Sequence, residues 1–386
     1  MMNTFARVSR GLKVARSCRT RSSRSEDTPL RRLLDEASAF NEGAATEPEL
    51  RWATQPYAVR PNEGDTNKAR VEPSHTTVLL FPGQGSQHVG MGKKLMHLPP
   101  VRELYELASS IVGWDVARVC TEGPEEELSR HCQIATLVTS LASLERLRDE
   151  RPSALERVRA AAGFSLGEIT ALTFAGALTL EGALRLVDIR AAAMRACSQE
   201  RRGGMLTVWL GADANLSHAL LRAREHAAEC GVAAPVCRVA NYLYPGCKVV
   251  AGDEEALRFV ERRGPEFGVR RAARVRVEGA FHTELMARAE DAVRAALHVL
   301  QVAEPRVRVV SAVDARPYRD ARHVRAQLAR HVTRPVRWEQ TLHVLYARPR
   351  DQHVPLTVTL GPAAALRSTL RQVNARAWDS SLQIQV

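Results

Sequence analysis

Long apolar runs and paired cysteines are both missing from this sequence of 386 residues. No segment approaches the roughly 18 uninterrupted apolar residues that a membrane-spanning helix needs, so we expect a soluble protein without a membrane span. The seven cysteines are an odd number and form no C-x-x-C pair, which argues against a disulfide framework and a zinc site. We interpret them as structural thiols in a reducing compartment and expect no metal.

Acidic residues are absent from the first 25 positions, where six arginines and one lysine lie among serines. This composition is typical of a mitochondrial transit peptide, with a disordered basic tail as the alternative. Residues 28–67 are polar and without periodicity, which predicts a linker. We therefore assign the range 1–67 to a transit peptide and linker, and we expect the protein in the mitochondrial matrix.

Aromatic residues are also few, at 5% of the sequence, and this bears on the net charge of +12. A basic protein with a pI near 9.8 can be an RNA-binding protein. However, the N-terminal segment supplies more than half of the net charge, and the sequence carries no nucleic-acid recognition motif. The sequence therefore argues against a nucleic-acid partner, and a non-enzymatic RNA-binding protein is the less favoured alternative.

Apolar patterning predicts alternating strands and helices on both sides of the middle of the chain. Strands are expected at 76–81, 306–313 and, as the last strand, 356–360, and helices at 104–113, 125–132, 133–148, from Thr179 onward, 324–331 and, as a closing helix, 366–373. This alternation favours a parallel sheet covered by helices.

The middle of the chain changes to the order β-α-β-β-α-β, which is the ferredoxin-like pattern. The expected strands are 205–210, 235–242, 247–251 and 269–277, and the expected helices are 214–230 and 253–264. We therefore expect an α/β fold in which a ferredoxin-like subdomain, 204–276, is inserted into a parallel-sheet core formed by 76–203 and 277–386.

Gly163-Phe164-Ser165-Leu166-Gly167 fits the G-x-S-x-G nucleophile elbow, in which a strand turns sharply into a helix with the serine at the tip. Glycines at both ends lack the Cβ atoms that would keep the strand and the helix apart. An ordinary glycine turn is the alternative.

Two other segments supply parts that a serine acyl-enzyme needs. Pro82-Gly83-Gln84-Gly85-Ser86 follows a predicted strand, and its backbone amides can face an oxyanion. A phosphate-cradling loop or a simple turn is the alternative, and a Walker motif is excluded because no Gly-Lys-Ser/Thr follows. His282 is a candidate general base. Arg190 interrupts an apolar stretch, 186–194, which favours a buried partner for it.

With the Gln84 loop, the Ser165 elbow and Phe281-His282 in this order, the sequence resembles the malonyl-CoA:acyl carrier protein transacylase family over 76–373. The mitochondrial member is the most similar. The resemblance implies an α/β-hydrolase-like parallel-sheet core with an inserted ferredoxin-like βαββαβ subdomain. It also implies a malonyltransferase that moves a malonyl group from malonyl-CoA to the phosphopantetheine thiol of acyl carrier protein through a seryl ester, in mitochondrial type II fatty acid synthesis. No cofactor is expected, because malonyl-CoA is the substrate and phosphopantetheine is carried by the partner; the oligomeric state is left open.

The matching positions imply roles for individual residues. Ser165 corresponds to the nucleophile and His282 to the catalytic histidine of the family. The backbone N–H groups of Gln84 and Leu166 correspond to the oxyanion hole. Arg190 corresponds to the arginine that binds the malonyl carboxylate.

Three further positions correspond to the lining of the substrate pocket, namely Asn241, Met194 and Phe281. The bulky Phe281 would favour malonyl over α-methyl-branched acyl groups, with a plain core phenylalanine as the alternative. Pro335-Val336-Arg337-Trp338 resembles the segment whose backbone carbonyl holds the catalytic histidine.

The sequence also departs from the family pattern. Phe164 stands where a histidine is usual, Thr283 replaces a common serine, and Ala363 ends what is often Gly-Pro-Gly. A serine hydrolase or thioesterase of similar fold is the main alternative function. Such an enzyme normally has an acidic triad member, which is not evident here, and it has no need of a carboxylate-binding arginine.

Overall fold

Strand β1 (Thr77–Phe81) lies in the middle of a parallel five-stranded sheet. The computed structural model describes residues 72–386, so the predicted transit peptide and linker, 1–67, lie outside the described residues. The strand order is β7-β2-β1-β8-β9, and every neighbouring pair is parallel. The other strands are β2 (Val158–Gly163), β7 (Arg308–Val310), β8 (Leu356–Thr359) and β9 (Ser381–Gln383).

Both faces of this sheet are buried, which explains why β1 is an unbroken apolar run. Leu79 and Phe81 pack on one face and Val78 and Leu80 on the other, because successive side chains of a strand alternate. The helices that share an apolar cluster with the first face are α2 (Pro99–Val112), α3 (Val116–Thr121), α4 (Glu125–Arg130), α5 (Cys132–Glu150), α6 (Pro152–Glu156), α7 (Leu166–Phe174), α8 (Leu180–Glu200), α11 (Ala287–Val299) and α12 (Ala321–Arg330). The other face is covered by α13 (Trp338–Tyr346), α14 (Ala364–Val373) and α15 (Ala375–Asp379).

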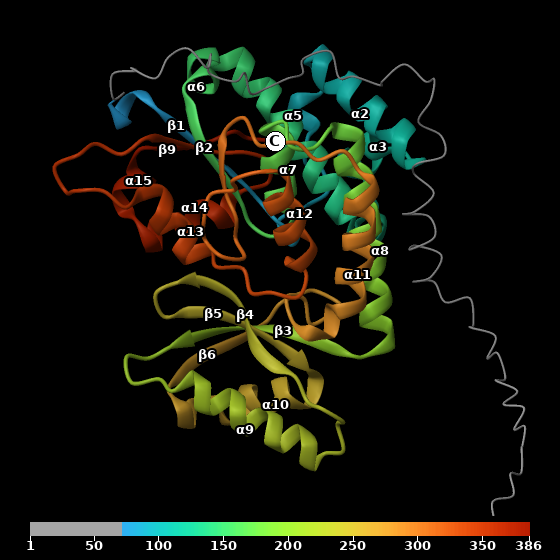
Figure 1. Ribbon diagram of the computed structural model, residues 1–386, viewed down its shortest axis with the longest axis vertical. Coiled ribbons are helices and arrows are strands. Elements are labelled where there is room, and N and C mark those ends of the chain that lie inside the picture. Colours follow the sequence, from blue (N-terminus) through green and yellow to red (C-terminus); the bar gives the residue numbers. More distant parts are fainter. Residues whose placement is uncertain (1–71) are drawn as a thin grey trace, which may run out of the picture.

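A second, antiparallel sheet forms the smaller lobe at the bottom of Figure 1. Its strand order is β4-β5-β3-β6, and α9 and α10 share one apolar cluster with it. In chain order the lobe consists of β3 (Gly203–Leu210), α9 (Leu216–Glu229), β4 (Cys237–Tyr244), β5 (Cys247–Asp253), α10 (Glu254–Arg263) and β6 (Val269–Arg274). This is the βαββαβ ferredoxin-like topology. The predicted fold class is confirmed.

Three details of the sequence-based prediction are wrong. The strand 356–360 is not the last, because β9 follows α14 and α15 and pairs with β8. Helix α2 begins at Pro99, not at 104, since proline suits the first helical turn. Helices α3, α6, α11, α13 and α15 were not predicted at all. In α11 most of the buried side chains are alanines, which carry little apolar signal.

Two sets of contacts fix the small lobe against the core. Arg201, just after α8, binds Asp253 at the end of β5 through two hydrogen bonds of 2.7 Å. In addition, β4 forms a parallel bridge with Val336: Tyr242 N–H donates to the Val336 carbonyl at 2.9 Å, and Val336 N–H donates to the Ala240 carbonyl at 2.8 Å. The lobe is therefore held to the core through the neighbouring strands β4 and β5.

No helix between residues 72 and 386 has the length and apolar character that crossing a bilayer requires. The six cysteines in this range are free thiols, and five of them are buried. Burial raises the pKa of Cys120 and that of Cys237 to about 12, which keeps these thiols protonated and unreactive.

The elbow depends on two glycines that allow three backbone segments to meet. A Cβ atom on Gly163 would lie 1.8 Å from the carbonyl carbon of Gly167 and 2.1 Å from the nitrogen of Glu168. A Cβ atom on Gly167 would lie 2.2 Å from the carbonyl oxygen of Phe81. Because all these neighbours are backbone atoms, no side-chain rotation can make room.

We expect Gly163→Ala to lower the free energy of unfolding by about 3 kcal/mol or more, because the added methyl group forces β2 and α7 apart. Urea denaturation followed by circular dichroism measures this loss. Gly204→Ala is the matched control, since its Cβ atom would meet its nearest neighbours at 3.4 Å. An unfolding free energy of Gly163→Ala within about 1 kcal/mol of the wild-type value would contradict the tight packing of the elbow.

Candidate active site

Ser165 stands at the sharp turn between β2 and α7, in a backbone conformation that non-glycine residues rarely adopt. Its φ is 51° and its ψ is −113°, and the residue is 8% exposed. Such strain persists only where the surrounding structure imposes it, as the packed glycines do here. The turn directs Oγ toward His282, with 2.9 Å between Oγ and Nε2.

His282 is 117 residues further along the chain and also has a positive φ, of 63°. Its Nδ1 lies 2.8 Å from the carbonyl oxygen of His331, and its backbone N–H donates to the carbonyl of Val332 at 2.9 Å. Because a carbonyl can only accept, Nδ1 must carry the proton and Nε2 must be free to accept one from Ser165. The pair has the geometry of a nucleophile and its base.

The expectation that the segment 335–338 holds this histidine is wrong. The backbone groups of Val336 already bridge to β4, and Arg337 donates to Ala312 and accepts from Thr341. The carbonyl that accepts the hydrogen bond from His282 Nδ1 is that of His331, which precedes this segment.

Arg190 reaches the same hydroxyl from α8 and is 2% exposed. Its Nη2 donates to Ser165 Oγ at 3.0 Å, and its Nη1 donates to Gln133 Oε1 at 2.5 Å. Its Nε has no hydrogen-bond partner, and no carboxylate between residues 72 and 386 lies at ion-pair distance from it. Desolvation lowers the pKa of Arg190 to about 10, which leaves it charged at neutral pH. A buried cation without a counter-ion is a binding site for an anion.

Gln133 belongs to the site although the sequence analysis did not single it out. This buried residue of α5 receives Arg190 on its oxygen, and its Nε2 donates to Gln84 Oε1 at 3.1 Å. The sequence signal for Gln133 is weak, because α5 also carries buried threonines and serines.

Gln84 and Leu166 lie on neighbouring loops after β1 and β2. The loops touch closely, since a Cβ atom on Gly83 would be 2.4 Å from the carbonyl oxygen of Phe164. Leu166 opens α7, and N–H groups in the first turn have no partner inside the helix. Both residues are therefore placed beside Ser165, at the positive end of α7.

The remaining predicted residues surround this centre. Met194 is buried one turn after Arg190, with its sulfur 3.9 Å from Gln133 Nε2. Asn241 of β4 is buried, and its Oδ1 has no hydrogen-bond partner among residues 72–386. Phe281 precedes His282 and packs in the same apolar cluster as Met194. Phe164 makes an edge-on contact with the ring of Trp338, with 5.6 Å between the ring centroids, so an apolar ring suits this position.

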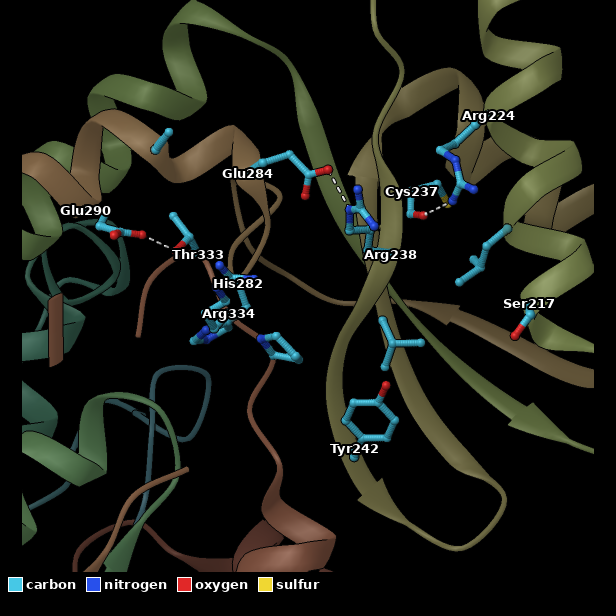
Figure 2. A pocket seen from close by; sticks show the side chains of 14 residues that line it. Ser217, Arg224, Cys237, Arg238, Tyr242, His282, Glu284, Glu290, Thr333 and Arg334 are labelled. Atoms are coloured by element: carbon cyan, nitrogen blue, oxygen red, sulfur yellow. Dashed lines mark hydrogen bonds and ion pairs between the residues drawn. The ribbon is translucent and has the colours of Figure 1, made fainter. Parts of the chain in front are cut away.

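A pocket of about 720 Å³ reaches His282 between the two lobes. Figure 2 shows its walls, with β4 and α9 on one side and the residues around His282 on the other. Three of the lining residues are arginines, Arg224, Arg238 and Arg334. Arg238 forms an ion pair of 2.5 Å with Glu284 across the pocket. Within 72–386, no cluster of three or more histidine, cysteine or acidic side chains is arranged to bind a metal ion.

Known proteins are similar to this chain over most of its length. The family model described as acyl transferase domain matches residues 78–377. The probable malonyl-CoA-acyl carrier protein transacylase, mitochondrial, of Drosophila melanogaster is 48% identical over 316 residues, which are 81% of this chain and 83% of that relative. The solved malonyl CoA-acyl carrier protein transacylase of Coxiella burnetii matches with a TM-score of 0.72 at 27% identity, over 82% of this chain and 95% of that one. A malonyl-transacylase solved in complex with its type II PKS acyl-carrier protein matches with a TM-score of 0.70 at 29% identity, over 81% and 96% of the two chains.

We expect Ser165 to react with a fluorophosphonate at a rate that is nearly independent of pH between about 5 and 8. Burial, with smaller effects of His331 and Arg190, lowers the pKa of His282 to about 3, so the imidazole stays neutral and able to accept a proton throughout this range. The loss of rate should appear only as the pH falls toward 3. Stopped labelling at each pH, with His282→Gln as the blank, measures the profile. A midpoint near the ordinary histidine pKa of about 6.5 would contradict this environment of His282.

Proposed function

Because the chain belongs to the acyl transferase family, we propose that Ser165 carries a malonyl group from malonyl-CoA to the phosphopantetheine thiol of acyl carrier protein. The chain is a malonyl-CoA:acyl carrier protein S-malonyltransferase, in agreement with the resemblance drawn from its three motifs. One observation carries the assignment of residues. The hydroxyl of Ser165 lies between the Nε2 of a base, His282, and the Nη2 of an unpaired guanidinium, Arg190.

In the first half-reaction, Ser165 Oγ attacks the thioester carbonyl of malonyl-CoA while its proton passes to His282 Nε2. The Oγ–C bond forms, the C–S bond breaks, and the proton on His282 goes to the leaving thiolate of CoA. In the second half-reaction, the carrier thiol gives its proton to His282 and attacks the malonyl ester. Ser165 leaves as the hydroxyl and recovers that proton, so atoms and charges balance over the cycle.

The tetrahedral intermediate places a negative charge on the former carbonyl oxygen. We assign the backbone N–H groups of Gln84 and Leu166 to this oxyanion, because they flank Ser165 on the two loops that meet there. Fixed N–H donors in an enclosed site stabilise such a charge, and one donor contributes on the order of 3 kcal/mol in the transition state.

Arg190 is assigned to the distal carboxylate of the malonyl group. Its planar guanidinium can form two charge-assisted hydrogen bonds with a carboxylate. Its Nε is free of protein partners, and its present acceptors, Gln133 and Ser165, are neutral. A carboxylate therefore gains an interaction that no group between residues 72 and 386 supplies.

The pocket between the lobes is assigned to the thiol-bearing arm of CoA and of the carrier. It reaches His282 and is lined by Arg224 and Arg334, where the phosphate of the arm can be compensated. A third arginine of the lining, Arg238, is already paired with Glu284. Fatty acid synthesis in the mitochondrial matrix is the setting that agrees with the mitochondrial relative.

We expect the wild-type chain to acquire one malonyl group on incubation with malonyl-CoA, and Ser165→Ala to acquire none. Intact mass spectrometry with peptide mapping locates the adduct. Ser198→Ala is the matched control, because Ser198 is equally buried at 8% and only donates to a carbonyl of its own helix. A Ser165→Ala chain that still carries the adduct rules out Ser165 as the nucleophile. Rapid release of malonate to water, with no transfer to a pantetheine thiol, would favour a hydrolase.

We expect Arg190→Ala to lower kcat/KM for malonyl-CoA by on the order of 10²- to 10³-fold, since the charge-assisted contacts are lost. Transfer of an acetyl group, which has no carboxylate, should change by only a few fold. Parallel assays with both thioesters give the ratio, and Arg195→Ala, on the same helix and bonded to the Arg130 carbonyl, serves as the control. Equal losses for malonyl and acetyl would refute the carboxylate-binding role.

A further inference from the structure

Glu168 is fully buried behind the elbow, and the mechanism above gives it no role. It lies in the first turn of α7, which starts directly after the nucleophile. Its carboxylate accepts hydrogen bonds from the Ala312 backbone N–H, at 3.0 Å, and from the Tyr318 hydroxyl. A carboxylate is stable in such a place only when its neighbours compensate for the loss of water.

His331 is the basic side chain that lies beside this carboxylate. Its Nε2 lies 3.2 Å from Glu168 Oε2, which is an ion-pair distance, although the ring N–H is not aligned for a hydrogen bond. Both side chains are buried. Between residues 72 and 386, no lysine or arginine lies within ion-pair distance of Glu168, so His331 is the basic side chain there at that distance.

The backbone at His331 supports the general base. The His331 carbonyl accepts the Nδ1–H of His282 at 2.8 Å, and the carbonyl of Val332 accepts the backbone N–H of His282 at 2.9 Å. The two imidazole rings stand edge to face, with 5.6 Å between their centroids. The segment 331–332 therefore fixes both the ring and the backbone of His282, and Glu168 contacts the side chain of this segment.

We propose that Glu168 and His331 are positioning residues for malonyl transfer: Glu168 fixes His331, and His331 fixes His282 in the tautomer and orientation that accept the Ser165 proton. The proposal rests on the assignment of Ser165 and His282 as nucleophile and base. In a serine triad the acid binds the base directly through Nδ1. Here the backbone carbonyl of His331 accepts the Nδ1–H of His282 instead. The acid, Glu168, contacts the side chain of His331 and not His282 itself.

The arrangement also connects Ser165, the nucleophile, to Glu168, which contacts the residue that holds the base. Glu168 and Ser165 lie on the same turn, because the Glu168 N–H donates to the Ser165 carbonyl at 2.9 Å. A shift of α7 would therefore move the nucleophile and the carboxylate together.

The test compares four variants in the rate of Ser165 acylation by malonyl-CoA. Glu168→Gln and His331→Leu should each lower kcat by about 10- to 30-fold with KM nearly unchanged. The contact that orients the base acts in the transition state, and the binding of the malonyl carboxylate by Arg190 is not affected. His331→Gln keeps a polar side chain of similar length in contact with Glu168 and should stay within about 3-fold of the wild type. The double variant Glu168→Gln/His331→Leu should be no slower than the slower single variant, since both changes interrupt one chain of contacts.

Thr170→Val is the matched control. It lies on the same helix, is fully buried, and its hydroxyl has no hydrogen-bond partner among residues 72–386, so its rate should match the wild type. Losses that multiply in the double variant, a Glu168→Gln rate equal to the wild type, or equal losses in His331→Gln and His331→Leu would each overturn the proposal. Where Glu168→Gln does not fold, the two His331 variants decide the matter. A wild-type chain that forms no Ser165 adduct would overturn the proposed function itself, and this result is distinct from all of the above.

Discussion

The guanidinium of Arg190 is enclosed in the core with no carboxylate of residues 72–386 at ion-pair distance, and the selectivity of the site follows from this fact. Burial of a charge is strongly unfavourable unless neighbours compensate it. Within the described residues, its neighbours Gln133 and Ser165 offer neutral oxygens, and its Nε has no acceptor at all. The protein therefore holds a cation that is only partly compensated. An acyl group with a carboxylate at its far end neutralises the charge of Arg190. An acyl group without a carboxylate leaves this charge only partly compensated.

The same charge connects substrate binding to the strength of the base. Arg190 is one of the causes that lower the pKa of His282 to about 3, after burial and His331. An imidazole with so low a pKa is a weak proton acceptor, since general bases are most effective when their pKa is close to the working pH. A bound carboxylate neutralises Arg190 and so removes one of these causes. It also competes for the Nη2 that donates to Ser165 Oγ. The group that is selected is thus the group that strengthens the base and frees the nucleophile.

Much of this arrangement could be predicted from the sequence, and the part that could not has a physical explanation. The elbow and the β-α-β-β-α-β order are local features: the spacing of glycines predicts the first, and runs of apolar residues predict the second. Helix α11 lacks such a pattern, because alanines fill most of its buried face. The pairing of β9 with β8 is a contact between segments that apolar periodicity does not report. Glu168 was visible in the motif, but its two hydrogen-bond donors lie 144 and 150 residues away, so its surroundings appear only in three dimensions.

The inserted lobe explains how a hydrolase-like elbow can favour transfer over hydrolysis. Ser165 and His282 are 8% and 5% exposed, so bulk water has little access to an ester formed at this turn. One approach to His282 is the pocket whose walls come from both lobes, with β4 and α9 on one side and the segment 333–335 on the other (Figure 2). A thiol on a long arm that enters this pocket is held beside the ester, and such an oriented reactant reaches effective concentrations of roughly 10⁵ M or more, far above that of water. The position of the lobe, fixed by Arg201 and by the Val336 bridge, therefore contributes to the choice of transfer over hydrolysis.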